Sequence, residues 1–106
     1  MKLLTAEIKK LPAIGATEEI DTCEKILKFK FFCPWNNWKW YPVEFDGKDE
    51  FFGLVDGDFV EWGYFTLSEM ESVKGLMGLK IERDLNWIPI KAKDIKTTGQ
   101  GGWNAE

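Results

Sequence analysis

Apolar and polar residues alternate with a period of two through much of the chain, which is typical of β-strands that bury one face. The clearest example is residues 25–33, KILKFKFFC, where Leu27, Phe29 and Phe31 alternate with two lysines. Turn residues separate this segment from further aromatic runs, and the sequence DGD at residues 56–58 is a strong hairpin signal. The pattern predicts four strands, over residues 25–33, 38–45, 51–55 and 59–66.

Two segments have the spacing of a helix instead. Apolar residues at helical intervals accompany Thr5, a good N-cap residue, and predict a short helix over residues 5–11. Ser68 and Glu71 have the spacing of a capping box, which predicts a second helix that begins at Ser68 and ends near Lys74.

Short strands joined by tight turns, together with two short helices, indicate an α+β fold. We predict an antiparallel meander sheet of about four strands with the two helices packed on one face. Residues 1–96 are predicted to form this single domain, in keeping with a length of 106 residues. The glycine-containing residues 97–106 are predicted to form a flexible C-terminal tail.

The composition narrows the possible functions. The net charge is −4, whereas a general binder of nucleic-acid backbones normally carries a basic excess. The chain has no histidine, no phosphate-binding glycine motif and no CxxC pair, so we predict no metal site, no cofactor and reduced cysteines at Cys23 and Cys33. The N-terminus has no long apolar run, which predicts neither a signal peptide nor contact with a membrane.

Six tryptophans and eight phenylalanines are many for this length, and such side chains supply either core or binding surface. One cluster is a candidate binding site and consists of Trp35, Trp38, Trp40 and Tyr41. Beside Lys39, these rings could stack on a base or nucleotide, or they could anchor a protein interface. The alternative is that Trp38 and Trp40 belong to the ordinary core.

A second candidate site is the charged run Glu82-Arg83-Asp84. In an extended chain the two carboxylates point one way and Arg83 the other. The planar guanidinium could then hold a phosphate or a carboxylate of a partner. The alternative is an internal ion pair from Arg83 to Glu69 or Glu71, which would fasten this segment to the second helix.

Several motifs also resemble a known family. They are KLLT at residues 2–5, KFKFF at 28–32, WKWY at 38–41, FFGLVDG at 51–57, GYFTLSEMESVKG at 63–75 and GLKIERDL at 78–85. Together they are similar to a family of short domains of unknown function that is carried by bacterial phages, plasmids and integrated elements. The resemblance covers roughly residues 2–95 and implies a mobile element as the carrier and the cytoplasm of a bacterial host as the location. It implies no catalytic residues.

Three functional hypotheses follow. The leading one is a non-enzymatic binding protein of the inhibitor type that occupies a host protein, such as a component of anti-phage defence. The second is a binder of nucleotides or single-stranded nucleic acid that uses the tryptophan cluster with Lys28, Lys30 and Arg83. The third is a small hydrolase that depends on Glu82 or Asp84, although the lack of histidine favours a protein that is not an enzyme. The sequence leaves the oligomeric state open.

Overall fold

A computed structural model describes residues 2–102 of the chain. Its main sheet is antiparallel, with the strand order β5-β4-β3-β2-β6. These strands are β2 (Phe31–Phe32), β3 (Lys39–Phe45), β4 (Glu50–Asp56), β5 (Val60–Thr66) and β6 (Glu82–Arg83). A second, two-stranded sheet joins β1 (Ile26–Leu27) to β7 (Ile90–Lys91). The helical elements are α1 (Ala6–Lys9), α2 (Leu67–Ser72) and the 3₁₀ turns η1 (Thr22–Glu24), η2 (Leu76–Gly78) and η3 (Ala92–Asp94).

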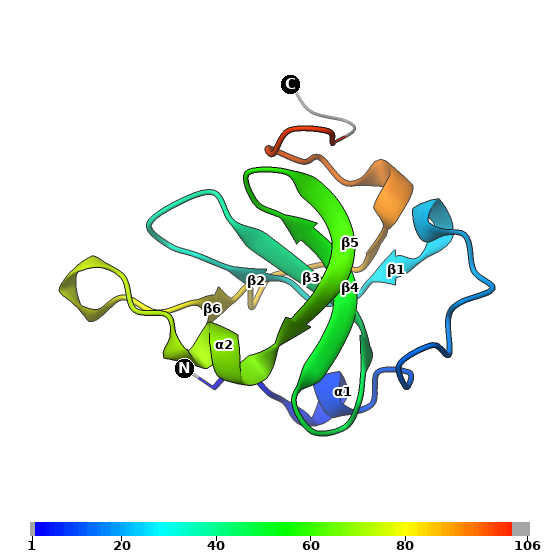
Figure 1. Ribbon diagram of the computed structural model, residues 1–106, viewed down its shortest axis with the longest axis horizontal. Helices are drawn as coiled ribbons and strands as arrows, with labels where there is room; N and C mark the ends of the chain where they lie inside the picture. The colour runs from blue at the N-terminus through cyan, green and yellow to red at the C-terminus, as the bar shows by residue number, and fades with distance from the viewer. Residues whose placement is uncertain (1, 103–106) are drawn as a thin grey trace.

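The main sheet buries apolar side chains on both of its faces. One face packs on α1 and α2 and forms the helix-side core; its buried residues include Ile8, Phe31, Phe45, Phe51, Phe65 and Met70. The other face packs on the second sheet and η3 and forms the second-sheet core, with Leu27, Tyr41, Val43, Leu54, Ala92 and Ile95. In Figure 1 both helices lie in the lower part of the molecule, and β1 lies to the right of the main sheet.

The α+β class is confirmed, and the sheet is larger than predicted. The strands expected at residues 38–45 and 59–66 are present as β3 and β5, and β4 extends the predicted 51–55 by one residue at each end. The single strand expected over residues 25–33 is wrong, because the chain passes from one sheet to the other within it. The alternating pattern continues across the crossing because apolar side chains face a core in both sheets.

A β-bulge in β3 decides which residues face which core. The pairing with β4 shifts between Pro42 and Glu44, since proline has no amide to donate to the ladder. Val43 and Phe45 therefore face opposite cores although they are two residues apart. The bulge also leaves Glu44 buried.

The N-terminal cap of α1 agrees with the prediction, whereas that of α2 does not. Thr5 caps α1 as expected, because its hydroxyl accepts a hydrogen bond from the amide of Ile8. The predicted cap of α2 at Ser68 is wrong, since Thr66 accepts from the amide of Glu69 at 3.1 Å and the helix begins at Leu67. The amide and hydroxyl of Ser68 instead donate hydrogen bonds to the carboxylate of Asp49, in the turn before β4.

The segment that follows residue 96 is held against the main sheet through residues 98–100. Asp56 is fully buried, and its carboxylate accepts hydrogen bonds from the amides of Thr98 at 3.0 Å and Gly99 at 2.8 Å. Lys39 Nζ lies 3.9 Å from the same carboxylate. The predicted flexible tail thus contains a docked segment, residues 97–102, while the rest of that prediction lies outside the described residues. Within the described chain, no helix is long and apolar enough to cross a membrane.

Candidate functional site

The four aromatic residues proposed from the sequence do not share one surface. Trp38 and Trp40 lie on the helix side of the sheet as a half-buried pair with ring centroids 5.8 Å apart. Tyr41 follows on the opposite face, because side chains alternate along β3, and it is almost fully buried against Trp87. Burial raises the pKa of the Tyr41 hydroxyl, and the charges of nearby aspartates raise it further. Tyr41 is therefore a core residue.

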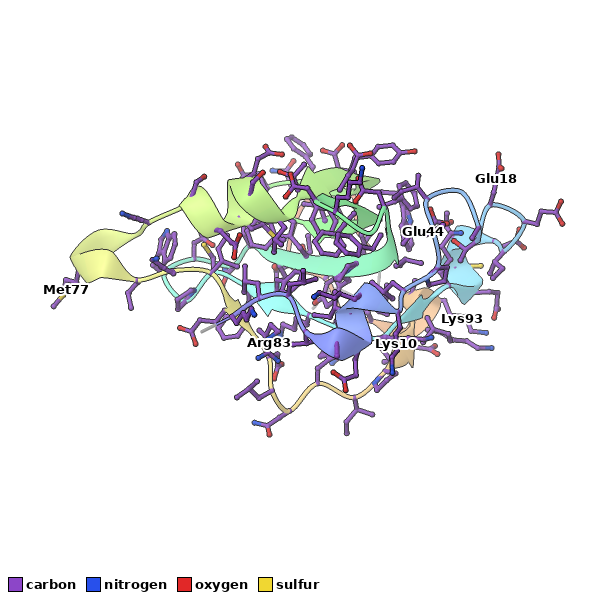
Figure 2. All side chains as sticks on the ribbon, turned by 90° about the horizontal axis from the view of Figure 1, so that it is seen from below. Lys10, Glu18, Glu44, Met77, Arg83 and Lys93 are labelled. Carbon is purple, nitrogen blue, oxygen red and sulfur yellow. The ribbon has the colours of Figure 1, made fainter. Side chains whose placement is uncertain are left out.

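Trp35 supports a projecting arm, which we define as residues 73–80. An added Cβ at Gly75 would lie 2.5 Å from the Trp35 ring, so the indole packs directly on the backbone of the arm. An isolated bridge between Lys74 and Lys80 closes the base. Figure 1 shows the arm extending from the sheet, and Figure 2 places Met77 at its far end, where the side chain is 93% exposed. Trp35 thus has a bracing role.

Trp38 lies beside an open depression at the β4–β5 turn, which we call the acidic groove. It comprises two adjoining hollows of about 310 and 720 Å³. Their lining residues include Trp38, Asp58, Phe59, Glu61, Trp62 and Tyr64, together with Asn36, Asn37, Thr98 and Gln100. In Figure 1 the green β4–β5 turn and the red C-terminal segment that border the groove lie near one another.

Exposed aromatic rings are the main feature of the acidic groove. Phe59 is 59% exposed and Tyr64 is 62% exposed. The turn at Gly57 presents Phe59 outwards and leaves no room for another side chain, because a Cβ on Gly57 would lie 2.6 Å from the Trp38 ring. Two carboxylates, those of Asp58 and Glu61, line the same hollow. Glu61 and Tyr64 lie on opposite faces of β5, because side chains alternate along a strand. The arrangement suits contact with a protein surface, where aromatic anchors dominate binding energy.

The sequence did not single out Phe59 or Tyr64. Both belong to aromatic runs whose alternation also fits a buried strand face, so their exposure has no clear sequence signal. The position of Phe59 directly after the DGD turn is the one hint, since turn residues are usually exposed.

The charged run on β6 is held by contacts within the protein. The Nε of Arg83 donates to the backbone carbonyl of Lys2 at 2.8 Å. Lys30 Nζ lies 3.7 Å from Asp84, whose carboxylate also accepts from the amide of Asn86. Among residues 2–102 no ion pair joins Arg83 to a glutamate of α2, so the partners predicted for Arg83 are wrong although its fastening role is present.

Substitution of Arg83 is expected to lower the free energy of unfolding. Arg83→Ala removes the donor that ties the N-terminal segment to β6, at a cost of about 1 kcal/mol. Arg83→Lys keeps the charge and loses the planar fork, so a smaller decrease is expected. Thermal unfolding of both variants checks this, and unchanged midpoints in both would show that the contact contributes nothing to stability.

The three cations that the sequence analysis assigned to nucleic-acid binding lie close together beside this run. Lys28, Lys30 and Arg83 line one depression beside Trp87, with Glu7 and Asp84 in the same wall. Lys30 lies 5.4 Å from the centre of the Trp87 ring, a cation–π distance. The tryptophan cluster that was expected to work with these cations lies elsewhere, as described above. Glu82 pairs across the sheet with Phe32.

The structure contains a buried polar network around Glu44 that the sequence did not predict. Glu44 accepts hydrogen bonds from the amides of Gly15 at 2.7 Å and Thr17 at 2.9 Å and from the Thr17 hydroxyl. The ammonium of Lys25, itself buried, donates to the same hydroxyl at 2.8 Å. Figure 2 shows Glu44 beside the loop that carries Glu18. The network fixes that loop on the sheet.

Within the described residues, no group of three or more histidine, cysteine, aspartate or glutamate side chains is arranged to hold a metal ion. Both cysteines are free thiols, with Cys23 exposed and Cys33 buried.

Comparison with known proteins identifies a family. The profile of a family described as "Protein of unknown function (DUF2958)" matches residues 3–92. The match includes the strands of the main sheet and the part of the acidic groove formed by the β4–β5 turn, and it ends before the docked segment at 97–102. No curated protein and no solved structure matches the chain.

Proposed function

Because the chain belongs to the DUF2958 family, whose function is unknown, we propose a function from its surface: it is a non-enzymatic protein that binds a partner protein through the acidic groove. The observation that carries this proposal is the exposure of two aromatic rings, Phe59 and Tyr64, along the edge strand of the sheet. Rings of this size that remain exposed beside polar groups are typical of protein interaction sites.

The partner that we propose is a host protein encountered by a phage, plasmid or integrated element, such as a component of anti-phage defence. The resemblance of the sequence motifs to mobile-element domains supports this choice of carrier. Inhibition would then result from occupying the partner and not from a reaction. The groove offers contact surface, and its lining residues do not form a matched acid, base and nucleophile.

The nucleic-acid alternative has one observation in its favour, the shared depression of Lys28, Lys30 and Arg83. It is weaker because two of these cations already contact other groups of the protein: Lys30 contacts Asp84, and Arg83 contacts Lys2. We do not propose the hydrolase, because Asp84 is engaged by Lys30 and by a backbone amide.

Affinity capture from host lysate tests the proposed function. The tag belongs at the N-terminus, since the C-terminal segment borders the groove. A Phe59→Ser, Tyr64→Ser variant removes the exposed rings, and a Leu85→Ser, Ile88→Ser variant removes equally exposed apolar side chains on another surface. We expect one partner to be captured by the wild type and the control variant and lost from the groove variant.

Two results would contradict the proposal. The first is a partner that the groove variant captures as well as the wild type does. The second is the repeated absence of any partner from lysates of several hosts. Thermal unfolding of all three proteins ensures that a loss of capture is not a loss of fold.

A further inference from the structure

The outer edge of β5 is open to an additional strand. β5 is the last strand of the main sheet and pairs with β4 on one side. On its other side, the Val60 amide donates to the carbonyl of Gln100 at 2.8 Å, and Phe59 and Gln100 form a parallel bridge. This edge therefore already accepts a short extended segment at its first residue.

The rest of the edge continues the same pattern. Amides of an edge strand alternate in direction, so those of Trp62 and Tyr64 point to the side on which Val60 meets Gln100. In the part of the chain that the structure describes, no further strand pairs there. Unpaired edges of this kind bind extended peptides by strand addition.

The charges beside this edge favour a basic occupant. Asp58 and Glu61 stand in the acidic groove, and none of the described residues that line it is lysine or arginine. The faces of Trp38 and Phe59 add attraction for a cation, because aromatic rings carry negative charge on their faces. The net charge of −4 would also speed the approach of a basic partner.

We infer that the acidic groove binds an extended segment of the partner protein in which lysine or arginine alternates with apolar residues, added as a strand to the edge of β5. The inference rests on the proposed function and specifies its partner. The segment's backbone pairs with the amides of Trp62 and Tyr64, and its cationic side chains lie beside Asp58 and Glu61.

Two other occupants fit these observations less well. A nucleic-acid strand would bring phosphates against Asp58 and Glu61, which repel them. A second copy of β5 paired at this edge would bring Glu61 carboxylates of both copies to the same sheet edge, and like charges across strands are destabilising.

A peptide titration of the isotopically labelled protein, followed by NMR, tests the inference. The probe is the capped nonapeptide KVKVKVKVK, and EVEVEVEVE is the matched peptide of opposite charge. We expect saturable shifts from the lysine peptide at the backbone amides of Trp62 and Tyr64 and at the Trp38 indole. The glutamate peptide should cause none of these.

Variants then test the role of charge. Asp58→Asn with Glu61→Gln should weaken binding of the lysine peptide by about tenfold or more, since two charged contacts are lost. Glu7→Gln with Glu71→Gln removes the same net charge from exposed positions on the two helices and should change binding little. If both double variants weakened binding of the lysine peptide equally, the interaction would depend only on the net charge of the protein, and the inference would be overturned.

Other outcomes are equally decisive. The inference fails if the lysine peptide does not bind, if its shifts lie away from β5, or if the oligonucleotide dT10 binds this groove more tightly. If the inference fails while the Phe59→Ser, Tyr64→Ser variant still loses its captured partner, the proposed function stands and the partner uses different chemistry. If that variant retains its partner, the proposed function itself is wrong.

Discussion

Replacing Phe51 by alanine is expected to lower the free energy of unfolding by about 3–5 kcal/mol. Phe51 is fully buried at the centre of the helix-side core. Its ring centroid lies 4.5 Å from that of Phe45, 5.5 Å from that of Phe65 and 5.9 Å from that of Phe31. The substitution therefore removes buried apolar area and leaves a cavity that three rings cannot all move to fill.

Chemical denaturation of the purified protein measures this effect. Phe59→Ala is the matched control, because it is the same substitution at a ring that is largely exposed, and a change within about 0.5 kcal/mol is expected there. If Phe51→Ala lowered the free energy of unfolding as little as Phe59→Ala does, Phe51 would not be at the centre of the core.

Replacing Glu44 by alanine is expected to have an effect of similar size, about 3–5 kcal/mol. The carboxylate is 3% exposed and is the common acceptor for the Gly15 amide and for the amide and hydroxyl of Thr17. Without it these donors lose their acceptor, and the buried ammonium of Lys25 loses the attraction of a nearby negative charge. The loop over residues 13–22 should then detach from the sheet.

The same carboxylate makes stability depend on pH. Burial raises the pKa of Glu44, but hydrogen bonds from Thr17 and Gly15 and the charge of Lys25 outweigh it and hold the pKa below its ordinary value of 4.5. Because the folded-state pKa is depressed, the stabilisation is complete above about pH 4.5 and is lost as the pH falls through the folded-state value.

Glu44→Gln should therefore be less stable than the wild type at neutral pH, and its stability should fall less steeply on acidification below pH 4.5. Denaturation curves collected from neutral to acidic pH measure both quantities. Glu61→Gln, at an exposed carboxylate, is the control and should keep the acid dependence of the wild type. An unaltered acid dependence in Glu44→Gln would show that this carboxylate is not the source.

The central hairpin was predictable because its signals are local. Alternating residues in β4 and β5 and the DGD turn between them specify two strands and their register without knowledge of the rest of the chain. The cap of α2 was misplaced by two residues for a comparable reason. Thr66 and Ser68 are both good caps, and the choice depends on a distant carboxylate, that of Asp49, which binds Ser68.

The errors elsewhere have non-local causes. Glu44 was not singled out from the sequence, since nothing near it in the chain indicates that Thr17 and Lys25 surround it. Arg83 was expected to seek a carboxylate, but it binds a backbone carbonyl, which every residue possesses and which no sequence pattern marks. For the candidate site, Trp38 was identified, but the exposed rings of Phe59 and Tyr64 required the structure.

The docking of residues 97–102 has a consequence for synthesis of the protein in the cell. Asp56 receives its amide hydrogen bonds from Thr98 and Gly99, more than forty positions later in the chain. A nascent chain that has exposed the β4–β5 hairpin thus cannot bury that carboxylate until residue 99 has left the ribosome. The second-sheet core likewise lacks Ala92 and Ile95 until these residues emerge, so its apolar face is open to chaperones up to that point. Folding of this domain during translation should accordingly follow the emergence of residue 99.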